Sequence, residues 1–365
     1  MLRNAFTRPL PVQVSRFECP AHIKCTSALV AGIALTIVHP NVAAASTLKL
    51  APPYENFGSY TTANPVNGDV TDIYFPTLGD RSPANNLPAV LLLQGALVDK
   101  GFYSDYASQV ARYGFAVAVP NHIQTVPGLG DVLASDTTQV QTVLDQFVAE
   151  SNNPASPLSG KVDTQKFGLL GHSLGGAVGL SVIGEICLFG FCPAPFERPE
   201  ALKGGAFFGA NLRDQSDIFL PIANDGVGIA LIQGEQDGRA LPINAERTFE
   251  QIQTPPKALI TLGGVNHFGI TTVNTPEGAI PDPNPQLVPQ ETSIETIARW
   301  SGLFLRGTVL DDKDALDYVF NTGAEADPIV VSVEGERAEP IPEPVSLVGV
   351  AGGLLSLIYL KKRTG

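Results

Sequence analysis

The chain has 365 residues and a formal net charge of -13; 44% of its residues are hydrophobic and only 16% are charged. This apolar fraction excludes a chain that stays disordered, and the length suits one large domain or two ordinary ones. The acidic balance argues against nucleic acid as a partner, because phosphates are neutralised by Lys and Arg.

The N-terminal segment has the pattern of a secretory signal peptide. Four basic residues accompany an apolar run over 28–38 that is too short to span a bilayer, and Ala43, Ala44 and Ala45 supply small residues at a cleavage site. We therefore predict that residues 1–45 are a signal peptide, with an uncleaved N-terminal anchor as the alternative. The rest of the chain is then an exported protein.

Residues 46–325 alternate short apolar runs with longer helical stretches. Several runs are continuously apolar, as in strands that helices bury on both faces. We expect strands at 70–75, 89–93, 115–119, 167–170, 206–208, 227–232 and 258–262, and helices at 102–113, 129–151, 174–186, 242–252 and 292–305. This alternation predicts a single α/β domain with a mostly parallel central sheet and helices on both faces.

Residues 171–176 read Gly-His-Ser-Leu-Gly-Gly and join an expected strand directly to an expected helix. A sharp strand-to-helix turn of this kind exposes the central hydroxyl and requires glycines where side chains would clash with backbone. The nearby helix N-terminus favours a developing negative charge. The context predicts that Ser173 is a nucleophile.

A serine nucleophile needs a base that a carboxylate orients, and after such a turn the order along the chain is Ser, acid, His. His22 and His39 lie in or beside the predicted signal peptide. His122 precedes the nucleophile, and His172 lies inside the turn, where it should point away from the hydroxyl. Elimination therefore leaves His267 as the predicted base.

The acid is predicted from its place after a strand. Asp237 follows the expected strand at 227–232, so it should lie at the same sheet edge as Ser173 and His267. Glu235 is the nearest alternative, although it comes earlier in the turn. We favour Asp237.

An oxyanion hole needs two backbone N–H groups. We expect one from Leu174, directly after the nucleophile, and the other from Ala96, in the turn after the strand at 89–93. Candidates for an apolar substrate pocket, which are equally compatible with core packing, are Leu97, Phe102 and Tyr103.

Two cysteines remain once the predicted signal peptide is removed. Cys187 and Cys192 are close enough in sequence to close a small loop as a disulfide in an oxidising compartment. The apolar loop 188–191 between them is a further pocket candidate. A metal site at this pair is only weakly indicated, because no His lies nearby. The sequence contains neither a metal-ligand cluster nor a phosphate-binding loop, so we expect no cofactor.

Together these motifs resemble the α/β-hydrolase superfamily over residues 65–320. Within it, the likeness is to the branch of chlorophyllases, dienelactone-hydrolase-like enzymes and cutinase-like polyester hydrolases. Residues 88–117 look like the chlorophyllase pattern, whereas residues 231–267 are more like the polyester hydrolase and lipase pattern, which supports Asp237. Chlorophyllases tend to have Arg where this chain has Leu174, and many relatives have His-Gly where it has Gln94 and Gly95.

The C-terminus combines Pro342-Glu343-Pro344, an apolar run over 345–360 and the basic cluster 361–363. This order resembles the PEP-CTERM sorting signal of bacterial exported proteins, which implies processing by an exosortase. A plain C-terminal membrane anchor is the alternative and gives the same topology. We predict an acidic linker at 326–344 and a transmembrane sorting tail at 345–365.

The sequence therefore predicts an exported, surface-retained or envelope-retained serine hydrolase of carboxylic esters that requires no cofactor. Its expected partners are an ester or lipid-like substrate, an exosortase-type enzyme and, through the tail, the membrane. The alternatives are a chlorophyllase-like dephytylating esterase and a non-catalytic surface protein that retains the fold.

Overall fold

The computed structural model describes residues 51–79, 82–126, 130–188 and 190–337. The predicted signal peptide and sorting tail lie outside these residues. Within them, no helix combines the length and the apolar character needed to cross a membrane.

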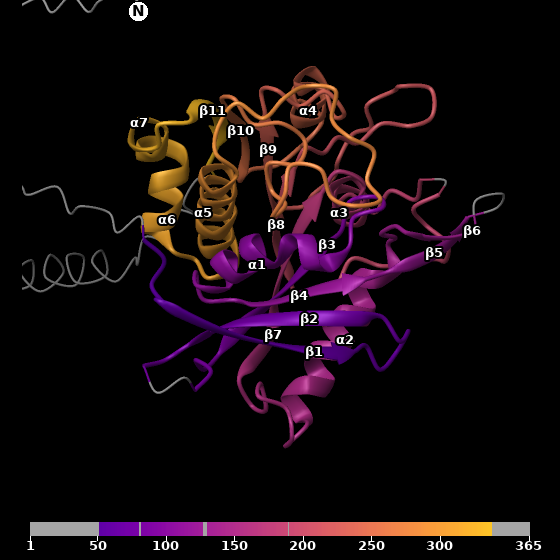
Figure 1. Cartoon of the computed structure of the whole chain (residues 1–365), viewed down its shortest axis with the longest axis vertical. Helices are drawn as coiled ribbons and strands as arrows, with labels where there is room; N and C mark the ends of the chain where they lie inside the picture. Colours follow the sequence, from indigo (N-terminus) through magenta and orange to yellow (C-terminus); the bar gives the residue numbers. More distant parts are fainter. Residues whose placement is uncertain (1–50, 80–81, 127–129, 189, 338–365) are drawn as a thin grey trace, which may run out of the picture. The chain divides into compact units, whose positions relative to one another are not determined.

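A nine-stranded sheet organises the described residues, in the order β1-β2-β4-β3-β7-β8-β9-β10-β11 (Figure 1). The run from β4 to β10 is parallel throughout, and the pairs β1–β2, β2–β4 and β10–β11 are antiparallel. The strands are β1 (Asn56–Ala63), β2 (Val70–Thr77), β3 (Leu87–Leu93), β4 (Ala116–Asn121), β7 (Val162–His172), β8 (Leu202–Phe208), β9 (Gly228–Gly234), β10 (Lys257–Leu262) and β11 (Val330–Glu336). The predicted mostly parallel α/β sheet is confirmed.

Two hydrophobic cores lie on the two faces of the sheet. Alternate residues of β3 separate them: Val90 and Leu92 belong to one core, and Leu91 and Leu93 to the other. Helices α1 and α5 cover the first core, and α2, α3 and α4 cover the second. Their bounds are α1 (Ser104–Ala111, preceded by the 3₁₀ turn η1, Lys100–Tyr103), α2 (Thr138–Asn152), α3 (Leu174–Ile183), α4 (Pro242–Phe249) and α5 (Gln290–Val309).

The helix expected at 129–151 begins later than predicted. Before it, β5 (Ile123–Val126) and β6 (Gly130–Leu133) pair as a separate antiparallel hairpin. Asp136 then accepts hydrogen bonds from the N–H and hydroxyl of Thr138, at the start of α2. A side chain that accepts from first-turn donors favours a helix start at this point.

The C-terminal domain boundary also differs from the predicted one. Residues 330–336, placed in the expected acidic linker, instead form the edge strand β11, which pairs with β10. The short helical segments α6 (Lys313–Asp317), η2 (Tyr318–Thr322) and α7 (Gly323–Ala326) lead to it. Edge strands are often protected by charged side chains, and β11 carries Glu334 and Glu336. This charged composition resembles that of a linker, which is why the sequence did not predict a strand here.

Candidate active site

Ser173 sits on a sharp turn between β7 and α3, with φ 52° and ψ -118°. This is a sparsely populated region for a residue with a side chain, so the surrounding structure must hold it there. The backbone N–H of Ser173 donates to the carbonyl of Phe208 at 3.0 Å. A Cβ on Gly171 would lie 2.7 Å from the Cα of Gly176, and one on Gly175 would overlap the carbonyl of Leu93. The turn is therefore packed too closely for side chains at these glycines.

The predicted site residues all follow parallel strands at their carboxyl ends. Ser173 follows β7, Ala96 follows β3, Asp237 follows β9 and His267 follows β10. Carboxyl ends of parallel strands meet at one sheet edge, where open α/β sheets place their ligands. The topology thus gathers side chains that are far apart in the sequence.

Asp237 and His267 form a buried pair. The Nδ1 of His267 lies 2.8 Å from Oδ2 of Asp237, and the two residues are 3% and 1% exposed, respectively. The other carboxylate oxygen of Asp237 accepts the backbone N–H groups of Arg239 and Ala240 at 2.9 and 2.7 Å. By contrast Glu235, the alternative acid, is exposed. The carboxylate of Asp237 is therefore fixed on three donors.

Ser173 and His267 line the same small cavity, of about 60 Å³. Within the described residues, no hydrogen bond is formed by the Ser173 hydroxyl, so the two side chains share a cavity without being joined. Hydrogen bonds between a nucleophile and its base are often long or absent without substrate and form fully only in the complex.

His172 connects three loops of the site from inside the protein. It is fully buried, its Nδ1 lies 2.9 Å from the hydroxyl of Tyr103, and its Nε2 lies 2.9 Å from the carbonyl of His267. Because a carbonyl only accepts, Nε2 carries the proton and Nδ1 accepts from Tyr103. The Tyr103 hydroxyl accepts in turn from the N–H of Gly95 at 2.8 Å. Burial, and then the nearby His267, hold the pKa of His172 well below its usual range, so its imidazole is neutral.

This network corrects part of the predicted substrate pocket. Tyr103 is fully buried and Phe102 packs on the core, and neither lines a cavity that contains Ser173. The carbonyl of Phe102 accepts the N–H of Thr272 at 2.8 Å, which ties the loop after β10 to the start of α1. Of the three candidates, only Leu97 lines the small cavity.

For the ester hydrolysis that the sequence predicts, replacing Tyr103 by Phe should lower kcat by about tenfold with little change in KM. The loss leaves the N–H of Gly95 and Nδ1 of His172 without buried partners, at a cost of about 1–3 kcal/mol in unfolding free energy. The misplaced loops then slow the reaction, because geometry at the reacting atoms is critical. Steady-state kinetics and thermal unfolding measure the two effects.

Tyr106→Phe is the matched control. Tyr106 is equally buried, and its hydroxyl donates to Ser301 Oγ at 2.9 Å, away from the cavities at Ser173. It should lose similar stability and keep its kcat. Equal kcat losses in the two variants would mean that the Tyr103 network is merely structural.

The two predicted oxyanion donors lie close to Ser173: Leu174 follows it in the chain, and Ala96 lines the small cavity with it. Leu174 is the first residue of α3, so its N–H has no acceptor within the helix. Ala96 is exposed at the small cavity, and among the described residues no group accepts its N–H. Both N–H groups are thus available for a bound ligand.

Gln94 anchors the loop that carries Ala96. Its amide exchanges two hydrogen bonds with the backbone of His122, at 2.9 and 3.2 Å. The His122 ring bridges Asp69 and Asp136 at 2.8 and 3.0 Å. Burial alone would lower the pKa of His122, but hydrogen bonds to Asp136 and Asp69 and their charges raise it to about 9. A charged, doubly paired imidazole therefore braces this loop at neutral pH.

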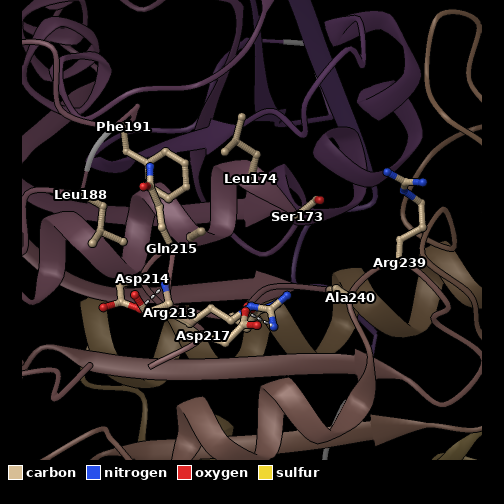
Figure 2. A pocket seen from close by; sticks show the side chains of 14 residues that line it. Ser173, Leu174, Leu188, Phe191, Arg213, Asp214, Gln215, Asp217, Arg239 and Ala240 are labelled. Atoms are coloured by element: carbon tan, nitrogen blue, oxygen red, sulfur yellow. Dashed lines mark hydrogen bonds and ion pairs between the residues drawn. The ribbon is translucent and has the colours of Figure 1, made fainter. Parts of the chain in front are cut away.

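A larger cleft of about 760 Å³ also opens at Ser173 (Figure 2). One part of its wall is apolar and consists of Leu174, Ala177, Leu188 and Phe191. The polar part consists of Asn211, Arg213, Asp214, Gln215, Ser216, Asp217 and Arg239. Sequence reasoning missed this polar wall, because charged loop residues without a motif carry no signal of a site.

The structure joins Cys187 and Cys192 in a disulfide with Cα atoms 5.4 Å apart. Leu188 and Phe191, inside the closed loop, line the cleft, and the carbonyl of Phe191 accepts the N–H of Thr137 at 2.9 Å. The loop is therefore fixed at both its disulfide and the start of α2. No metal-binding group of three or more His, Cys, Asp or Glu side chains occurs in the part of the chain that the structure describes.

The mostly parallel sheet, its covering helices and the strand-turn-helix at Ser173 define an α/β-hydrolase fold. A family model described as PETase, PET hydrolase-like, matches residues 41–185, which include β1 to α3 and Ser173. No curated protein matches the chain. Asp237 and His267 lie beyond the matched segment, so their assignment rests on their order in the sequence and on the geometry of the site.

Proposed function

We propose that the protein is an exported serine hydrolase that cleaves carboxylic esters through an acyl-enzyme. The observation that carries the proposal is the buried Asp237–His267 pair at a cavity that it shares with Ser173 on its strained turn. The matched family model is named for hydrolysis of the polyester PET, which supports an ester as the substrate class.

In the proposed reaction, the Ser173 hydroxyl attacks the ester carbonyl while Nε2 of His267 takes its proton. Nδ1 is occupied by Asp237, which orients the ring and stabilises its positive charge. The N–H groups of Leu174 and Ala96 bind the oxyanion. His267 then returns the proton to the leaving alcohol. Water attacks the acyl-enzyme carbonyl while His267 takes its proton, and the return of that proton to the Ser173 oxygen releases the acid.

Export and surface retention belong to the same proposal. They rest on the signal-peptide pattern of residues 1–45 and on the PEP-CTERM-like tail at 345–365, which an exosortase would process near Pro342. The disulfide between Cys187 and Cys192 suits an oxidising compartment.

A fluorophosphonate probe tests the proposal, because it reacts with activated serines. The full chain should be labelled at Ser173, as located by peptide mass, and labelled protein should be found in the envelope or surface fraction. Ser173→Ala should abolish both labelling and hydrolysis of p-nitrophenyl esters. An unlabelled wild-type protein without esterase activity would support the non-catalytic alternative, and label confined to the cytoplasm would contradict export.

A further inference from the structure

The two cavities at the candidate active site have only two lining residues in common. These are Ser173 and Arg239; all other lining residues belong to one cavity or the other. The cleft has a volume of about 760 Å³ and the cavity a volume of about 60 Å³, and Ser173 and Arg239 line both. An ester bound at the Ser173 hydroxyl, in either of them, therefore lies in a site that Arg239 also lines.

Arg239 is fixed at its backbone and unpaired at its side chain. Its N–H donates to Oδ1 of Asp237 at 2.9 Å, so its position depends on the proposed catalytic acid. Its side chain is exposed and, among the described residues, has no hydrogen bond or ion pair. Arg213, in the same cleft, instead pairs with Asp217 at 2.9 Å. In Figure 2 the Arg239 side chain lies on the opposite side of Ser173 from Leu188 and Phe191.

The carboxylates around Arg239 are engaged with other groups. Asp237 holds His267, and Asp217 holds Arg213. Asp214 and Asp282 accept backbone N–H groups, which for Asp282 include that of His267 at 2.8 Å. Among the described residues, Arg239 is thus a cation without an ion-pair partner, and it lines both cavities at Ser173. A guanidinium in this state matches a carboxylate, to which it can donate two parallel hydrogen bonds.

We propose that Arg239 binds a free carboxylate of the substrate, so that the enzyme favours half-esters of dicarboxylic acids, or esters of carboxylated alcohols, over their neutral counterparts. This inference rests on the proposed esterase function. Arg239 is then a specificity-determining residue, and the apolar wall around Leu188 and Phe191 receives the uncharged part of the same molecule.

Matched substrate pairs test the proposal. Monomethyl adipate against dimethyl adipate places the carboxylate on the acid side, and 4-butyryloxybenzoate against its methyl ester places it on the alcohol side. The readout is the ratio of kcat/KM for the anionic ester to that for the neutral ester. Arg239→Gln should lower this ratio about fivefold in at least one pair, and Arg239→Lys should lower it less. Added NaCl should reduce the wild-type ratio but not that of Arg239→Gln.

Arg247→Gln is the control for net charge. Arg247 is exposed, lies over the ring of Phe219 and lines neither cavity at Ser173, so its loss should leave the ratio unchanged. Equal ratios in wild type and Arg239→Gln, for both pairs, would overturn the proposal while esterase activity stands. Absence of hydrolysis of every ester, without probe labelling, would instead overturn the proposed function and this inference with it.

Discussion

Asp237→Asn is expected to lower kcat for ester hydrolysis by about 10⁴-fold while the protein stays folded. The amide oxygen can keep the hydrogen bonds from the N–H groups of Arg239 and Ala240, which the carboxylate accepts at 2.9 and 2.7 Å. Its NH₂ group then faces Nδ1 of His267. An amide donor at that atom forces Nδ1 to accept, so the proton moves to Nε2.

The consequence is a base whose reactive nitrogen is already protonated. His267 in this tautomer cannot take the proton of Ser173, although every side chain keeps its place. Steady-state kinetics with a p-nitrophenyl ester and the rate of fluorophosphonate labelling measure the loss. Thermal unfolding checks that the variant is folded.

Glu235→Gln is the matched control for this substitution. It removes a carboxylate two residues earlier in the same turn, from an exposed side chain. Its kcat should stay close to that of wild type. If Glu235→Gln lost more activity than Asp237→Asn, the acid would be wrongly assigned.

Gly175→Ala should damage both stability and reactivity. The new Cβ would overlap the carbonyl groups of Leu93 and Gln94, which are backbone atoms at the end of β3 and cannot rotate away. Overpacking of this kind costs about 3 kcal/mol or more. The Tm should fall by roughly 6–12 °C, and displacement of the turn should slow labelling of Ser173 by at least about 100-fold.

Gly79→Ala provides the comparison. Gly79 lies in the turn after β2, and a Cβ there would meet no atom within 4 Å. Its Tm and labelling rate should match those of wild type. A Gly175→Ala protein with wild-type Tm and labelling rate would contradict the prediction, because it would mean that the turn can move away from β3 with little loss of folding free energy.

The parallel strands could be predicted from sequence because burial on both faces leaves an apolar run. The run at 89–93, for example, coincides with the end of β3, where every side chain is buried. β1 and β11 carry no such run, since each is an edge strand with an exposed face. Their pairing depends on backbone hydrogen bonds, which no side-chain pattern records.

The residues of the candidate site that could be predicted were those identified by a motif or by elimination of the alternatives. The turn at Ser173 has a sequence signature, and the scarcity of histidines singled out His267, which the structure places 2.8 Å from Asp237. The internal role of Tyr103 was not accessible, because an aromatic residue near a site has the same pattern whether it lines a pocket or the core. Arg239 was missed for a similar reason, since a loop arginine reveals its lack of a partner only in three dimensions.

The close packing of the turn at Ser173 restricts substitutions there more than in the loops that line the cleft. Gly171 and Gly175 admit no side chain, so the segment that presents Ser173 has almost no freedom to vary. The cleft, by contrast, is lined by residues 213–217 and by Leu188 and Phe191 of the disulfide-closed loop, which lie outside the strands of the sheet. Loops tolerate substitution far better than packed elements. Under the proposed function, substitutions in these loops can therefore change the substrate, while the turn that presents Ser173 stays the same.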